Sequence, residues 1–230
     1  MKGQLLIRHG DVLTPDGEFC FCDILIQDGR IQEVVPSPPG RGPEAQTVIQ
    51  AADGYVLPGL IDLHTHGIRT VSAETGDLRE YARIEASFGA TTFYPTLFGP
   101  PQESARQMQR HRRETDDLRR LPQVGGFRLE SPYLAQTGAG VSKDLVPISA
   151  ETTEMLLAAG EGHIKIWDVS PELDGAPDLI HQLSRQGIVC SIAHTQATIE
   201  QARAAVDAGA RLVTHLFDVF PIPENRGTGV

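Results

Sequence analysis

The chain has 230 residues, of which 40% are hydrophobic, and it carries a formal net charge of −10. The acidic balance argues against nucleic-acid and membrane-surface roles, because both need a basic face. No apolar run approaches the ~20 residues of a membrane span, so we expect a cytoplasmic protein. The three cysteines, Cys20, Cys22 and Cys190, cannot form a closed disulfide set and are expected to be free.

The first part of the chain predicts a small β domain over residues 1–57. Short apolar runs at 4–8, 22–27, 31–35 and 47–50 have the composition of strands. Asp28-Gly29 and Asp53-Gly54 are typical of tight turns between strands. We therefore expect a small antiparallel, sandwich-like unit.

Residues 58–230 predict a different architecture, because apolar strands alternate with segments of helical period. The predicted strands are 56–63, 91–97, 124–130, 163–169, 188–193 and 211–216. The predicted helices are 77–88, 101–118, 149–160, 173–186 and 196–208. This is a parallel α/β pattern with six units of a (β/α)₈-type barrel, and we expect an incomplete barrel truncated after the sixth strand.

Five candidate metal ligands follow these strands. His64 and His66 are two positions apart at a strand end, so their side chains point the same way and can bind one divalent metal. Glu130, His194 and His215 each end a later apolar run. Because the carboxyl ends of barrel strands meet at one rim, we expect all five residues to form one metal site.

Several neighbouring residues have a structural alternative. Strand-end histidines can serve as ordinary hydrogen-bonding residues, and Glu130 could instead pair with Arg128. Asp62 is expected to orient its loop rather than to bind metal. Lys165 lies in the middle of a strand and is expected to be structural or to face the substrate. The remaining histidines are expected on the surface or in loops: His9, His111, His163 and His181.

Six motifs in chain order carry a family resemblance. They are LPGLIDLHTHG (57–67), GATT with PT (89–96), FRLESPY (127–133), SPE (170–172), AHTQA (193–197) and THLF (214–217). With these motifs the chain resembles the amidohydrolase superfamily and, within it, the N-acetylglucosamine-6-phosphate deacetylase family. The His-x-His motif is shared by the superfamily, whereas the combination of the later motifs is specific to the deacetylases.

The resemblance implies a barrel of the metal-dependent-hydrolase type that cleaves the amide bond of an N-acetyl amino sugar. Glu130, His194 and His215 would be the principal metal ligands, and His64 and His66 would serve a second ion. Zinc is the expected metal, with iron and manganese as alternatives. The expected partners are a small-molecule amide, a phosphorylated amino sugar among the candidates, and further copies of this chain in a homo-oligomer.

Some positions depart from the family pattern. The family has Asn-Ala-Met after the THLF motif, where this chain has Asp218-Val219-Phe220, and it has a histidine at the position of Gly140. Arg226 matches the phosphate-contacting arginine, so we place Asp218 and Arg226 at the substrate. The family's catalytic aspartate lies beyond Val230, so low activity is expected of this chain alone. A cyclic-amide hydrolase, a deaminase and a non-catalytic metal-binding fragment stay open as alternatives.

Overall fold

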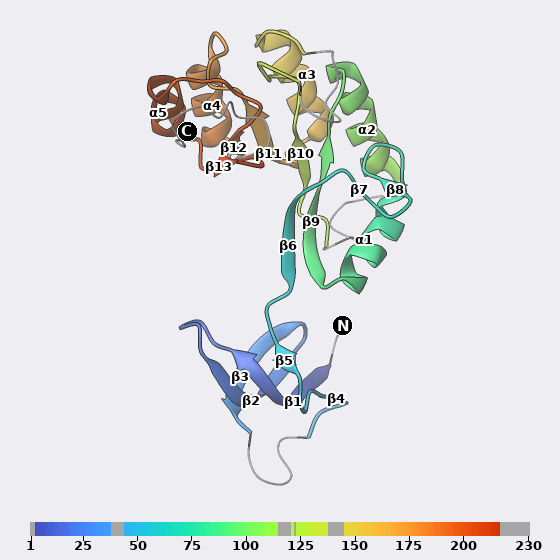
Figure 1. Cartoon of the computed structure of the whole chain (residues 1–230). Helices are drawn as coiled ribbons and strands as arrows, with labels where there is room; N and C mark the ends of the chain where they lie inside the picture. Colours follow the sequence, from blue (N-terminus) through green and yellow to red (C-terminus); the bar gives the residue numbers. More distant parts are fainter. Residues whose placement is uncertain (1–2, 38–43, 115–120, 122, 138–144, 217–230) are drawn as a thin grey trace. The chain divides into compact units, whose positions relative to one another are not determined.

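The chain divides into two compact units, Met1–Gly59 and Leu60–Val230, in a computed structural model (Figure 1). The structure describes residues 3–37, 44–114, 121, 123–137 and 145–216. Within these ranges, no helix has both the length and the apolar character that crossing a membrane requires.

The first unit is one mixed β-sheet. Its strands are β1 (Gln4–Leu13), β2 (Phe19–Gln27), β3 (Arg30–Pro36), β4 (Thr47–Gln50) and β5 (Tyr55–Val56). Strands β1, β2 and β3 pair antiparallel, whereas β4 and β5 both run parallel to β1. The antiparallel sandwich-like unit expected here is therefore replaced by a single sheet, because the long β1 pairs with β4 and β5 at successive positions.

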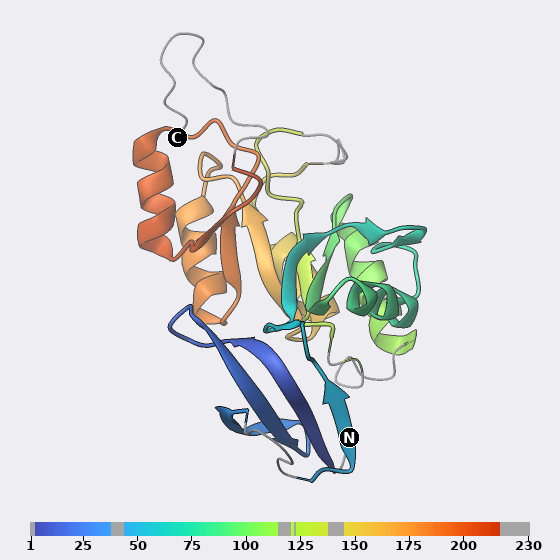
Figure 2. The same cartoon turned by 60° about the horizontal axis from the view of Figure 1, so that its bottom comes forward.

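The second unit contains a curled parallel sheet of six strands (Figure 1, Figure 2). In spatial order these are β13 (Leu212–Val213), β12 (Val189–Ile192), β11 (Ile164–Val169), β10 (Phe127–Leu129), β9 (Ala90–Leu97) and β6 (Leu60–Thr65). A small hairpin, β7 (Gly67–Ile68) and β8 (Val71–Ser72), follows β6. The predicted parallel α/β fold is confirmed.

Five helices accompany the sheet: α1 (Leu78–Ser87), α2 (Pro101–Glu114), α3 (Ala150–Gly160), α4 (Ala176–Arg185) and α5 (Ile199–Ala208). Helices α1, α3 and α5 begin after Asp77, Ser149 and Thr198, whose side chains accept hydrogen bonds from backbone N–H groups of the first turn. Large buried side chains fill this unit, among them Trp167, Tyr81, Tyr133, Phe93 and Phe127. This core holds the strand ends in place.

Two predicted strands differ from the observed ones. The segment predicted over 56–63 is split into β5 and β6, which belong to different sheets. The split falls at Pro58-Gly59, where proline lacks an N–H for a ladder. The segment predicted over 124–130 is regular only from Phe127, after Gly125 and Gly126. Residues 115–118 of the predicted helix 101–118 lie outside the described part of the chain.

Candidate metal centre

Four of the five candidate ligands, the histidines, converge on the buried carboxylate of the fifth, Glu130. One of its oxygens, Oε1, lies 2.9 Å from Nε2 of His194 and 3.1 Å from Nε2 of His215. The other, Oε2, lies 2.7 Å from Nε2 of His66 and 3.4 Å from Nε2 of His64. Four imidazoles from three separate parts of the sequence therefore present the same ring nitrogen to one acidic group.

The ends of four parallel strands supply these side chains. His64 lies in β6 and His66 directly follows it, while Glu130 directly follows β10. His194 and His215 each come two residues after their strands, β12 and β13. The parallel pairing of the sheet brings these carboxyl ends to one edge, as the sequence pattern predicts.

The backbone is strained at two of these positions. His194 has φ 45° and His215 has φ 29°, so both adopt a left-handed conformation that non-glycine residues rarely take. Such strain costs about 1–3 kcal/mol per residue and persists where the surroundings fix it. Here Ser170 supplies part of that support, because its hydroxyl lies 2.7 Å from the Ala193 carbonyl and 3.0 Å from the His194 carbonyl.

The SPE motif fixes the loop that carries His194. Besides the contacts of Ser170, Glu172 accepts hydrogen bonds from the Thr195 hydroxyl and, at 2.7 Å, from the backbone N–H of Gln196. The loop after β11 thus holds the loop after β12. The sequence pointed to the SPE motif only through the family resemblance, and the structure gives its physical role.

Polar contacts also orient His64 and His66. Nδ1 of His66 lies 3.1 Å from the carbonyl oxygen of Thr96. Because a carbonyl only accepts, this Nδ1 carries a proton, and Nε2 is the ring nitrogen that faces Glu130. The Asp62 carboxylate accepts the backbone N–H of His64 at 3.0 Å, in agreement with the expectation that Asp62 orients the loop.

The charge of the cluster suits a cation. Burial raises the pKa of Glu130, but hydrogen bonds from His194, His64 and His66 outweigh it and hold that pKa well below its ordinary value. The Nε2 atoms of His64 and His66 are 3.1 Å apart, so two lone pairs there would need a proton or a cation between them. Ligand atoms of His64, Glu130 and His215 lie within 4.8 Å of one another, and the group could hold a metal ion. Nitrogen and oxygen donors of this kind fit a divalent transition metal.

Other predicted residues lie elsewhere or outside the description. Asp218, Arg226 and Gly140 fall outside the described ranges. Lys165 is exposed and donates to the carbonyl of Gly162 at 2.8 Å.

One expectation was wrong. His111 was placed on the surface or in a loop, yet it is fully buried in α2, with Nε2 2.6 Å from the Ala73 carbonyl. His111 lies three positions after Met108 and seven after Ser104, which are also buried, so the helical period of this face was the signal that could have identified it.

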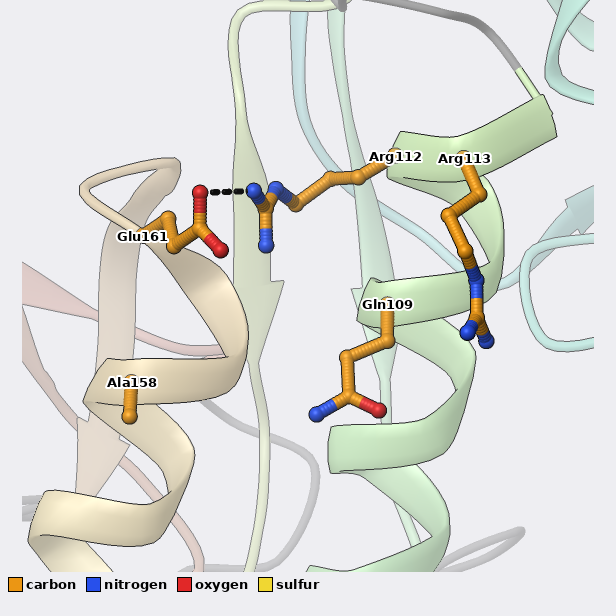
Figure 3. Close-up of a pocket in the computed structure, with 5 residues that line it drawn as sticks. All are labelled: Gln109, Arg112, Arg113, Ala158 and Glu161. Atoms are coloured by element: carbon orange, nitrogen blue, oxygen red, sulfur yellow. Dashed lines mark ion pairs between the residues drawn. The ribbon is translucent and has the colours of Figure 1, made fainter.

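A separate hollow lies between α2 and α3 (Figure 3). Its lining is Gln109, Arg112, Arg113, Ala158 and Glu161. The Arg112 guanidinium points toward Glu161 and forms an ion pair with it. Among the described residues that line the hollow there is no histidine or cysteine and none of the five candidate ligands, so it is distinct from the candidate metal centre.

The sequence of this chain is similar to those of known deacetylases. The chain is 26% identical, over 99% of its length, to an N-acetylglucosamine-6-phosphate deacetylase from Lysinibacillus sphaericus. It is also 26% identical, over 98% of its length, to an N-acetylgalactosamine-6-phosphate deacetylase from Escherichia coli O157:H7. It spans 59% of each of these relatives. No protein-family model matches the chain.

A solved structure agrees with these relatives. The N-acetyl-D-glucosamine-6-phosphate deacetylase of Mycobacterium smegmatis superposes with a TM-score of 0.77 at 30% identity, covering 94% of this chain and 61% of that one. The resemblance to the deacetylases is confirmed. An aspartate-to-alanine mutant of the Mycobacterium smegmatis deacetylase was solved in complex with N-acetyl-D-glucosamine-6-phosphate, with a TM-score of 0.78.

Proposed function

We propose that this chain carries the metal centre of a deacetylase that hydrolyses the amide bond of an N-acetyl amino sugar phosphate. The observation that carries the proposal is the convergence of His64, His66, His194 and His215 on the single carboxylate of Glu130. In this proposal Glu130, His194 and His215 hold the principal ion, and His64 and His66 serve a second one. Zinc suits this mixed set of imidazole and carboxylate donors.

In this proposal, the residues of the chain hold the metal ion and orient the side chains that bind it. When bound, a divalent cation polarises the amide carbonyl and lowers the pKa of a water molecule. Glu130 keeps its negative charge at neutral pH, which compensates part of the charge of the cation. Thr96 orients the ring of His66, and Ser170 holds the backbone that carries His194.

Proton transfer to the leaving amine needs a further acid–base group. Asp218 is the first candidate within this chain, because it is the carboxylate that follows His215 most closely in the sequence. Arg226 is proposed to contact the substrate phosphate, since a guanidinium pairs well with phosphate oxygens. Both assignments concern residues outside the described ranges and rest on the sequence.

The proposed substrate is a 6-phosphorylated N-acetyl amino sugar. One relative was solved with N-acetyl-D-glucosamine-6-phosphate, and another is named as acting on the galactosamine epimer. Both epimers therefore belong in the assay. Arg226→Ala should raise KM for the phosphorylated sugar more than for its unphosphorylated analogue.

The test measures zinc binding first and hydrolysis of the substrates second. The 230-residue chain and Glu130→Gln should be purified, stripped with a chelator and titrated with zinc. We expect wild type to bind zinc, to hydrolyse the phosphorylated sugars slowly, and to lose activity on chelation, while Glu130→Gln loses most of the affinity. Turnover of a cyclic amide alone would replace the deacetylase proposal with another amidohydrolase activity. Zinc binding without turnover of any substrate would favour a non-catalytic role.

A further inference from the structure

A buried polar network lies directly beneath the metal ligands. Arg128 precedes Glu130 by two residues on β10, Leu63 precedes His64 on β6, and Thr214 precedes His215 after β13. Arg128 is 2% exposed and its partner Asp168, on β11, is fully buried. The residues that lie one or two positions before the ligands thus form a layer of their own.

The Arg128 guanidinium makes contacts in three directions. It forms a bidentate ion pair with Asp168, with Nη2 2.8 Å from Oδ1 and Nε 3.1 Å from Oδ2. Nη1 donates to the carbonyl of Leu63 at 2.9 Å, and Nη2 donates to the Thr214 hydroxyl at 2.6 Å. One side chain on β10 therefore bonds to β6, to β11 and to the residue that follows β13.

The hydroxyl groups of this network have defined hydrogen-bond directions. The Thr214 hydroxyl donates to Oδ1 of Asp168 at 2.9 Å, so it accepts from Arg128 and from the Ser191 hydroxyl at 2.7 Å. Ser191 lies on β12, three residues before His194. A buried network of this kind specifies one arrangement, because any other leaves a charged group without partners.

The contacts of Arg128 with Leu63 and with Thr214 lie at opposite edges of the sheet. Strands β6 and β13 are the two edges of the six-stranded sheet, and no backbone ladder joins them among the described residues. His64 comes from one edge and His215 from the other, yet their ring centroids are 5.5 Å apart. Arg128, like Glu130, contacts residues at both edges, and it does so through Leu63 and Thr214, the residues that immediately precede His64 and His215.

We propose that Arg128 is a positioning residue that sets the distance between His64, on β6, and His215, which follows β13. The inference rests on the proposed metal centre and adds to it the element that determines its geometry. Lysine could not take this role, because an ammonium group is a point charge without the planar fork that reaches three strands at once.

Arg128→Lys tests the proposal, because it keeps the charge and removes the fork. The matched control is Arg83→Lys, which makes the same change in an exposed pair with Glu80. Zinc affinity is measured by competition with a chromophoric chelator, and ligand geometry by the visible absorption of bound Co²⁺. We expect Arg128→Lys to weaken zinc affinity at least about tenfold, the range of supporting contacts around metal ligands, and to alter the Co²⁺ spectrum. Arg83→Lys should match wild type in both.

A second variant covers the case in which Arg128→Lys does not fold. Thr214→Val keeps the shape of the side chain and removes only the hydroxyl link beside His215. It should bind zinc severalfold more weakly and shift the Co²⁺ spectrum, although it is folded by circular dichroism. Folded variants with wild-type affinity and spectrum would overturn the inference and leave the metal centre intact. A wild-type chain that binds no zinc would overturn the metal centre itself, and this inference with it.

Discussion

Individual ligand residues differ most in their burial. His194 has a side chain 2% exposed, whereas that of His66 is 38% exposed. The buried imidazole is held by the SPE loop, and the exposed one lies at the open side of the cluster. In the proposed assignment, His194 belongs to the principal ion and His66 to the second.

Removing these two imidazoles should therefore give unequal results. His194→Ala is expected to lower zinc affinity by more than about 100-fold, because even supporting contacts are worth 10- to 100-fold. His66→Ala should leave one tight zinc per chain and remove the weaker one. Zinc stoichiometry measured by metal analysis after dialysis checks both. Equal losses in the two variants would show that the cluster holds one shared ion.

His111 connects burial to pH. Burial lowers its pKa, although the hydrogen bond to the Ala73 carbonyl opposes the shift. In the unfolded chain the imidazole gains its proton near pH 6.5, while in the folded protein it does so only at lower pH. The unfolded state thus binds more protons below that pH, and stability falls as the pH falls.

The variant His111→Gln should reduce this dependence, because glutamine keeps a donor for Ala73 and does not titrate. The urea midpoint of wild type should fall between pH 7.5 and 5.5 by more than that of the variant. His181→Gln, at an exposed position on α4, is the control and should follow wild type. If His111→Gln shows the full wild-type slope, another group is responsible.

Two glycines beside the ends of elements, Gly126 and Gly187, have a positive φ. Gly126 has φ 141°, and a Cβ placed there would lie 2.5 Å from the His163 carbonyl oxygen. Gly187, after α4, has φ 79° with open space around it. Both positions favour glycine for their conformation, but only Gly126 is also enclosed by a neighbouring strand.

Alanine at these two glycines should separate strain from steric clash. Gly187→Ala is expected to cost about 1–2 kcal/mol of unfolding free energy, the cost of a left-handed residue with a side chain. Gly126→Ala should cost about 1–3 kcal/mol more, because β10 must also move away from the residues leading into β11. Denaturant unfolding of both variants measures the difference. Equal costs would mean that β10 shifts freely.

The sequence predicted the helices and the convergence of the five candidate ligands better than it predicted strand lengths. Apolar runs that end in His or Glu indicate strand ends, because parallel topology brings these ends together whatever the exact pairing. The boundary at Phe127 depends on Gly125 and Gly126 facing Tyr94 and Lys165, which only the folded neighbours reveal. The partner of Arg128 could not be predicted either, since Glu130 and Asp168 were equally available by charge.

For the whole molecule, apolar side chains remain exposed along the sheet. Ile61 on β6 is 61% exposed, and Val189 and Val213 on β12 and β13 are 41% and 45% exposed. Edge strands with exposed apolar side chains favour association with another chain. The homo-oligomer expected from the sequence stays a prediction, and these exposed side chains give it a surface that can be tested.

A lysine on the β13 edge should reduce that association, because a charge there opposes strand pairing. Val213→Lys is compared with Val206→Lys, a residue of similar exposure on the neighbouring helix α5. Sedimentation velocity over a range of concentrations should show less association for Val213→Lys and a wild-type distribution for Val206→Lys. The reverse result would place the contact on α5.

The distances along the chain that the cluster bridges have a kinetic consequence. Glu130 meets His194 across 64 positions and His215 across 85. Contacts of such long range form late, after most of the loop-closure entropy has been spent. In the proposed metal centre, an ion would therefore find its complete set of ligands only once the strands have assembled. Its binding would then delay unfolding far more than it accelerates folding, and would protect the assembled sheet against transient opening.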